Sequence, residues 1–139
     1  MNNFEKLFKN KMDDLKIAEY NSLTLAFLGD AIYTAFIRAL LVKDKNLINT
    51  KLHTMSNNYI KSSAQAKTIN LIYETLSDNE KDVVRRARNH RSKTRPKNST
   101  VSDYNDATGF EALLGYLFLK GEYDRLIEIL SKGYEENVD

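Results

Sequence analysis

Two carboxylates stand in the most apolar parts of this sequence and are its first candidates for chemistry. Asp30 lies in the run LTLAFLGDAIYTAFIRALL, and Glu111 lies in the run GFEALLGYLFL. An ionised carboxylate inside an apolar helix is costly unless a cation or a hydrogen-bond donor faces it. Both acids therefore need a partner, and one divalent metal ion could serve them together.

A glycine accompanies each of these carboxylates. Gly29 directly precedes Asp30, and Gly115 lies one helical turn after Glu111, on the same face of the helix. Because a glycine lets a second backbone approach closely, we expect the two helices to pack together so that the acids converge. Converging carboxylates repel one another unless a proton or a cation lies between them. Hard oxygen ligands favour Mg²⁺ or Mn²⁺, with water completing the shell.

Simpler pairings remain open for both acids. Asp30 could form a salt bridge with Arg38 or with a lysine of another helix, and Glu111 could cap a backbone or pair with Lys120. Asp30, Thr34 and Arg38 also recur at a spacing of four residues, which predicts a narrow polar stripe on the helix. If that stripe faces a groove instead of the core, Asp30 is less buried than its apolar neighbours suggest.

A strongly basic segment precedes the second apolar helix. From Val83 to Ser102 the chain holds seven Lys or Arg residues and no acid, which leaves 14 bases and 19 acids elsewhere, a net charge of −5. Such asymmetry indicates a polyanionic partner. No aromatic residue lies between Val83 and Val101, so contact with the backbone of a duplex fits better than base stacking. A solvated basic loop without a partner is the competing interpretation.

The elements that must position these groups are predicted to be helices. The chain of 139 residues has one proline and five glycines, and it lacks an alternating strand pattern, so we predict one all-α domain over residues 1–139. Ser22 is the expected N-cap of the second helix, and Ser77 with Glu80 forms a capping box that opens the fifth. Helices are expected at about residues 3–18, 22–42, 50–62, 64–76, 77–89 and 102–119, and, after a turn at Gly121, near the C-terminus.

Composition narrows the class of protein. The chain is 42% hydrophobic and 29% charged, as ordinary soluble proteins are. Its lack of cysteine excludes disulfides and Cys-based zinc sites and fits the cytoplasm, and neither His53 nor His90 has a zinc-ligand partner in sequence. The charged N-terminus is not expected to be a signal peptide. Residues 23–42 are not expected to span a membrane, because Asp30 and Arg38 would each cost roughly 2.5–3.5 kcal/mol there.

Both carboxylate motifs resemble those of a known enzyme family. LAFLGDAIY, which contains Asp30, resembles the signature of ribonuclease III, and FEALLGYLFL, which contains Glu111, resembles that family's second motif. Their order and their spacing of about eighty residues also match. No double-stranded RNA-binding domain is expected after the second motif. Together with the RARN…PKN run, this looks like Mini-III, the small bacterial ribonuclease III, over roughly residues 22–133.

The resemblance implies a homodimeric ribonuclease III-type fold of about seven helices and an endoribonuclease that cleaves double-stranded RNA. Asp30 matches the family's essential aspartate and Glu111 its essential glutamate, both linked to Mg²⁺, for which Mn²⁺ can substitute. Ala26 and Thr108 stand where the family has two further acids, as in Mini-III proteins. The resemblance also implies that the protein matures the 23S ribosomal RNA precursor. Whether a ribosomal protein assists it is left open.

Duplex RNA is expected to lie across the dimer, against a basic loop at about residues 85–102. The expected contacts to phosphates and riboses are basic or amide side chains: Arg85, Arg88, Asn89, Lys93, Lys97, Asn98, Lys61, Gln65 and Lys67. We expect the loop over residues 89–100 to be mobile without RNA, because it offers little apolar surface.

Two other hypotheses compete with the nuclease. The first is a non-catalytic RNA-binding module on the same fold, which the residues Ala26 and Thr108 favour. The second is a helical interaction protein without a role in RNA metabolism.

Overall fold

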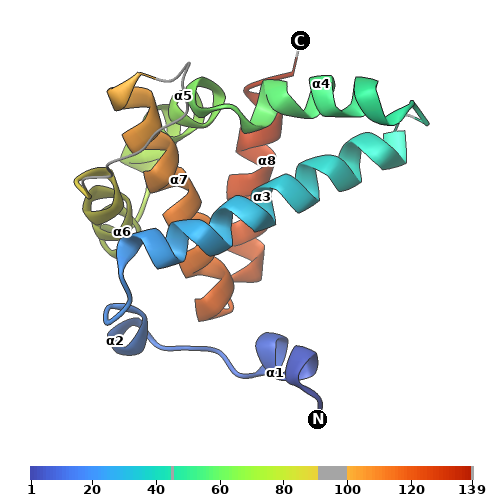
Figure 1. Cartoon of the computed structure of the whole chain (residues 1–139). Helices are drawn as coiled ribbons and strands as arrows, with labels where there is room; N and C mark the ends of the chain where they lie inside the picture. Colours follow the sequence, from blue (N-terminus) through green and yellow to red (C-terminus); the bar gives the residue numbers. More distant parts are fainter. Residues whose placement is uncertain (45, 91–99, 139) are drawn as a thin grey trace.

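The computed structural model describes residues 1–44, 46–90 and 100–138, and over these ranges it consists of helices without a strand (Figure 1). The all-α prediction is therefore confirmed. In chain order the helices are α1 (Asn3–Lys9), α2 (Asp14–Ile17), α3 (Ser22–Asp44), α4 (Asn49–Ile60), α5 (Ser62–Ile72), the 3₁₀ turn η1 (Tyr73–Thr75), α6 (Asp78–Arg88), α7 (Val101–Lys120) and α8 (Tyr123–Glu135).

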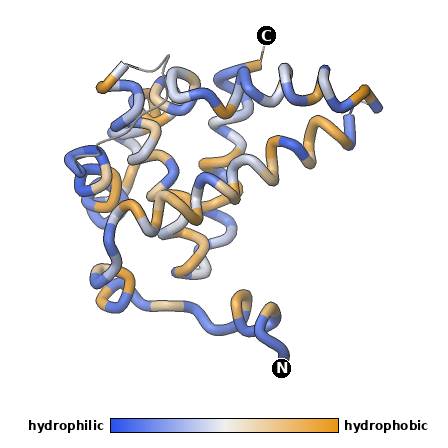
Figure 2. Tube along the Cα trace, in the orientation of Figure 1, coloured by the Kyte–Doolittle hydropathy of each residue, from blue (hydrophilic) through white to orange (hydrophobic). Residues whose placement is uncertain are grey.

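Helix α7 lies at the centre of the molecule, with α3, α5, α6 and α8 packed around it (Figure 1). A helix surrounded in this way must be apolar on every side, and Phe110, Leu113 and Leu114 of α7 are completely buried. Figure 2 shows hydrophobic residues along both α7 and α3. The left-handed conformation of Gly121, with φ of 76°, ends α7 and turns the chain into α8.

The backbones of α3 and α7 touch at two glycines. A Cβ atom on Gly29 would lie 1.6 Å from the backbone oxygen of Glu111, and one on Gly115 would lie 2.2 Å from the backbone oxygen of Leu25. No side chain fits at either place. Because Leu25 precedes Gly29 by one turn and Gly115 follows Glu111 by one turn, the helices run in roughly opposite directions where they touch.

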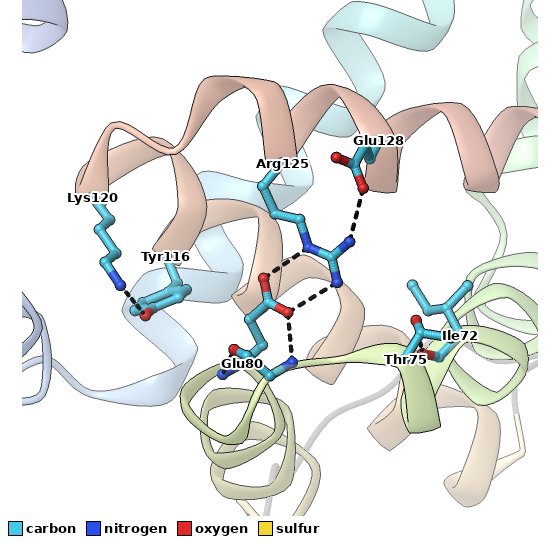
Figure 3. A network of polar contacts seen from close by, with 8 residues as sticks. Ile72, Thr75, Glu80, Tyr116, Lys120, Arg125 and Glu128 are labelled. Atoms are coloured by element: carbon cyan, nitrogen blue, oxygen red, sulfur yellow. Dashed lines mark hydrogen bonds and ion pairs between the residues drawn. The ribbon is translucent and has the colours of Figure 1, made fainter.

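A buried carboxylate joins the start of α6 to α8 (Figure 3). Ser77 and Glu80 form the predicted capping box, and the Glu80 carboxylate also accepts hydrogen bonds of 2.9 and 3.0 Å from the Arg125 guanidinium. Burial raises the pKa of Glu80, but the hydrogen bonds from Arg125 and Ser77 outweigh it, so that the pKa lies below its ordinary value. Glu80 is therefore ionised at neutral pH and holds two helices together.

The N-terminal segment differs from the predicted single helix over residues 3–18. It forms α1 and α2, because the Asp13 side chain accepts a hydrogen bond from the backbone N–H of Lys16 and starts a new helix. Asp14 then accepts hydrogen bonds from the Tyr116 hydroxyl at 2.7 Å and from the Lys120 ammonium at 3.2 Å. These contacts attach α2 to the end of α7.

The other helix boundaries lie within a few residues of the prediction, although Ser22 does not cap α3. Ser22 is the first residue of that helix, and Asn21 Oδ1 instead accepts a hydrogen bond of 2.8 Å from the backbone N–H of Leu23. Helix α3 is long and apolar enough to pass as a membrane span by length and composition. Its residues Leu25, Tyr33 and Ile37 are buried in the protein core, as in a core helix of a soluble fold.

The crossing of α3 and α7 predicts a severe effect of any side chain at Gly29. Gly29→Ala should destabilise the protein by at least about 3 kcal/mol, because the new methyl group would collide with backbone that cannot move aside. Gly109→Ala should cost less, because its Cβ would meet a side-chain atom of Val84 at 3.0 Å. Thermal and urea unfolding of both variants measures the difference. Equal losses of stability in the two variants would contradict the prediction that the backbone contact at Gly29 tolerates a side chain less well than Gly109 does.

Candidate active site

Asp30 and Glu111 meet where α3 crosses α7. Gly29 lies against the backbone of Glu111, so the next residue of α3 is carried to the same place. The Asp30 carboxylate lies close enough to Glu111 to raise its pKa. The structure thus brings together the two acids that the sequence singled out.

The two acids differ in their exposure to solvent. Asp30 is exposed, whereas Glu111 is partly buried. The expectation that Asp30 is buried is therefore wrong for the single chain, because α3 packs with one side only on α7. The alternative, that Asp30, Thr34 and Arg38 form a polar stripe accessible to solvent, fits the structure better. Arg38 is also exposed, and Thr34 is partly exposed.

The carboxylate pair determines the charge of Glu111. Burial, followed by the negative charge of Asp30 and the hydrogen bond to it, raises the pKa of Glu111 to about 8. The Gln65 amide acts in the opposite direction, because its hydrogen bond favours the ionised form of Glu111. At neutral pH the protein without a cation therefore keeps a proton on Glu111, and a bound cation would replace that proton.

The simpler pairings that the sequence left open are not formed. No ion pair joins Asp30 or Glu111 to a lysine or arginine within the described ranges. Lys120 pairs with Asp14 at 3.2 Å. The pair of acids thus has no protein cation to neutralise it there.

The donor set fits a hard divalent cation. Two carboxylates supply oxygen ligands, and Mg²⁺ commonly binds one or two carboxylates and keeps several waters. No group of three or more His, Cys, Asp or Glu side chains with the geometry of a metal site exists among the described residues. Ala26 and Thr108 are buried, and the Thr108 hydroxyl donates to the backbone oxygen of Tyr104 at 2.9 Å. Each chain therefore offers two acids to a cation.

Two of the predicted RNA contacts are engaged inside the protein. Gln65 is only 2% exposed, so the prediction that it contacts RNA is wrong for this structure. Arg88 donates to Asp106 and to Asn70, both at 2.7 Å, and its guanidinium lies 5.0 Å from the centre of the Tyr73 ring. Arg88 therefore joins α6 to α5 and α7. The sequence held no signal for this cluster, because its members are far apart in the chain.

The remaining predicted RNA contacts divide into two groups. Lys93, Lys97 and Asn98 lie outside the described residues, as does most of the loop expected to be mobile. The others are exposed, and two have partners in the protein: Arg85 pairs with Asp82 at 2.7 Å and the Lys67 ammonium donates to the backbone oxygen of Glu136 at 2.7 Å. The exposed members of the predicted set are Arg85, Asn89, Lys61 and Lys67.

The raised pKa of Glu111 predicts a dependence of stability on pH in the absence of metal. A carboxyl whose pKa is higher in the folded than in the unfolded protein stabilises the fold at low pH, and this contribution is lost as the pH rises through about 8. Wild-type protein in EDTA should therefore lose stability between pH 5 and pH 8.5 relative to Glu111→Gln, which cannot ionise.

Melting temperatures of the two proteins across this pH range measure the effect, which should reach a few °C. Glu74→Gln, at an exposed carboxylate far from the site, is the control and should follow the wild type. If the melting temperatures of the wild type and Glu111→Gln changed in parallel with pH, Glu111 would not carry a proton at neutral pH.

Comparisons with known proteins show the family of the chain. The sequence profile of the Ribonuclease III domain matches residues 23–122, a range that contains both acids. The Mini-ribonuclease 3 of a Thermoanaerobacter species is 49% identical over 114 residues, covering 82% of this chain and 80% of that protein. The Mini-ribonuclease 3 of Staphylococcus aureus is 34% identical over 125 residues, covering 88% of this chain and 93% of that protein.

A solved structure extends the agreement to the fold. A crystal structure of a Fusobacterium nucleatum protein matches with a TM-score of 0.79 at 27% identity, and the match covers 86% of this chain and 96% of that one. Profile, relatives and fold all point to one group of proteins. The chain therefore belongs to the ribonuclease III domain family, among the Mini-ribonuclease 3 proteins.

Proposed function

We propose that this endoribonuclease of the ribonuclease III type acts as a homodimer that cleaves double-stranded RNA with Mg²⁺ bound by Asp30 and Glu111 of each subunit. Its substrate in the cell is the precursor of 23S ribosomal RNA, and its compartment is the cytoplasm. Residues 1–139 form its single catalytic domain. The observation that carries the proposal is the meeting of Asp30 and Glu111 at the crossing of α3 and α7.

The exposure of the two acids supports a role in hydrolysis. Asp30 is open to solvent and Glu111 lies behind it, so a phosphodiester of a large substrate can reach the pair without entering a closed pocket. A divalent ion bound there would activate water and stabilise the charge that develops at phosphorus. The part played by the chain itself is to hold both carboxylates in place on two helices of its core.

An apolar face on α3 supports the homodimer. Phe27 is 81% exposed and Val42 is 61% exposed, and with Ala31 and Arg38 they lie along one side of the helix at spacings of four, seven and four residues. Large exposed apolar side chains on one helix indicate an interface. A twofold axis near this face would place two carboxylate pairs close to the two strands of one RNA duplex.

The charge distribution supports a duplex substrate. The basic segment from Val83 to Ser102 contrasts with the acidic remainder of the chain. The exposed Arg85 and Asn89 lie in the N-terminal part of this segment. Lys61, which precedes α5, and Lys67, within α5, are exposed and add positive charge. Lys93, Lys97 and Asn98 complete the proposed contacts with phosphates and riboses.

Removal of either acid should abolish cleavage while RNA binding persists. Asp30→Asn and Glu111→Gln should each lower the rate on a labelled perfect RNA duplex in Mg²⁺ by at least about 100-fold, because several kcal/mol of transition-state stabilisation depend on the bound cation. EDTA should stop the wild-type enzyme, and Glu74→Gln should cleave normally. A gel assay that resolves bound, free and cut duplex makes all these measurements.

Two results of that assay would count against the nuclease. If folded Asp30→Asn cleaved at the wild-type rate, Asp30 would not be required for cleavage. A duplex that is bound but never cut by the wild-type protein, at any Mg²⁺ concentration, would favour a non-catalytic RNA-binding module, to which the residues Ala26 and Thr108 also point.

The proposed dimer predicts a charge-sensitive interface on α3. Phe27→Asp should convert the dimer to a monomer, because an ionised carboxylate would be buried between two apolar helix faces. Leu71→Asp changes an equally apolar side chain on α5, 59% exposed, and should leave the dimer intact. Sedimentation velocity of the three proteins at micromolar concentration measures this. A monomeric wild type, or a dimeric Phe27→Asp, would refute this interface.

A further inference from the structure

Gln65 joins the carboxylate pair to the junction between α4 and α5. Its side chain is almost completely buried, which is uncommon for glutamine. Its Nε2 donates a hydrogen bond of 2.7 Å to the backbone oxygen of Ile60, the last residue of α4. Carbonyls at the end of a helix lack a partner within it. Because a carbonyl can only accept, this bond also fixes which end of the amide carries the nitrogen.

The same amide lies beside the Glu111 carboxylate, on whose ionisation it acts. An amide nitrogen carries two N–H groups, so one can serve Ile60 while the other faces the Glu111 carboxylate. Gln65 therefore connects the end of α4 with the acid that α7 contributes to the site.

The other end of the amide is unsatisfied. Gln65 Oε1 is buried and has no hydrogen-bond partner within the described part of the chain, a state that costs free energy and is rare in folded proteins. Such a buried oxygen can accept a hydrogen bond from a water molecule. Water molecules bound to a divalent cation are donors of this kind.

We propose that Gln65 is a positioning residue of the nuclease site, which holds the Glu111 carboxylate in the orientation in which it receives the divalent cation together with Asp30. This inference rests on the proposed function, since it requires the carboxylate pair to bind the cation. Side chains that hydrogen-bond a metal ligand typically contribute 10- to 100-fold to metal affinity or activity.

The test is direct binding of Mn²⁺ to the RNA-free protein, followed by electron paramagnetic resonance of the free ion. Gln65→Met keeps the length and the unbranched shape of the side chain but removes the amide. We expect it to bind Mn²⁺ roughly 10- to 100-fold more weakly than the wild type. In cleavage assays the Mn²⁺ concentration at half-maximal rate should rise similarly, while the rate at saturating Mn²⁺ changes much less.

A matched control separates positioning from packing. Thr68 lies three residues after Gln65 on α5, is completely buried, and donates to the backbone oxygen of Ala64 at 3.1 Å. Thr68→Val should lower the melting temperature and leave the affinity for Mn²⁺ unchanged. If Gln65→Met does not fold, Gln65→Asn decides the question by the same measurement, because its amide is too short to reach both Ile60 and Glu111.

The outcomes distinguish this inference from the proposed function. Wild-type Mn²⁺ affinity in Gln65→Met, alongside lost affinity in Glu111→Gln, would overturn the role of Gln65 alone. Wild-type affinity in Glu111→Gln as well would overturn the metal site itself. Weaker binding in both variants, with Thr68→Val unchanged, is the result that the inference requires.

Discussion

Helices α3 and α7 approach one another until backbone touches backbone, at Gly29 against Glu111 and at Gly115 against Leu25. Helices that pack through larger side chains lie about 8–10 Å apart. At the glycine contacts α3 and α7 come closer than that, and Asp30, which follows Gly29, is carried to Glu111. The site therefore depends on two positions that have no side chain, and α5, α6 and α8 pack around a helix whose place is set by this contact.

The carboxylate pair is costly to the free protein. The pKa of about 8 for Glu111 means that one acid must hold a proton at neutral pH or repel its neighbour. Such unfavourable arrangements are common where proteins act on substrates. Near the pair, Ala26 and Thr108 are buried without a charge, and Thr108 has a hydrogen-bond partner. A cation bound between Asp30 and Glu111 would relieve the repulsion of the two acids.

Helix α3 has one side in the protein core and another side exposed to solvent. One side, with Leu25, Tyr33 and Ile37, belongs to the core, and the other side exposes Phe27 and Val42. Its nearly continuous apolar sequence therefore does not mean burial on all sides within one chain. Asp30 lies near the border between the two surfaces, so association of two chains through α3 would bring the second site close to the first.

The sequence by itself determined most of the helices and singled out the two acids. Apolar runs, the capping box at Ser77 and the glycine at position 121 are local signals, and local signals set where helices begin and end. The rest of the site followed from packing. That Asp30 is exposed, that Gln65 is buried against Glu111 and that Arg88 is held by Asp106 depend on which helix faces meet. Contacts between residues far apart in the chain leave no pattern in a single sequence, so only the tertiary structure decided them.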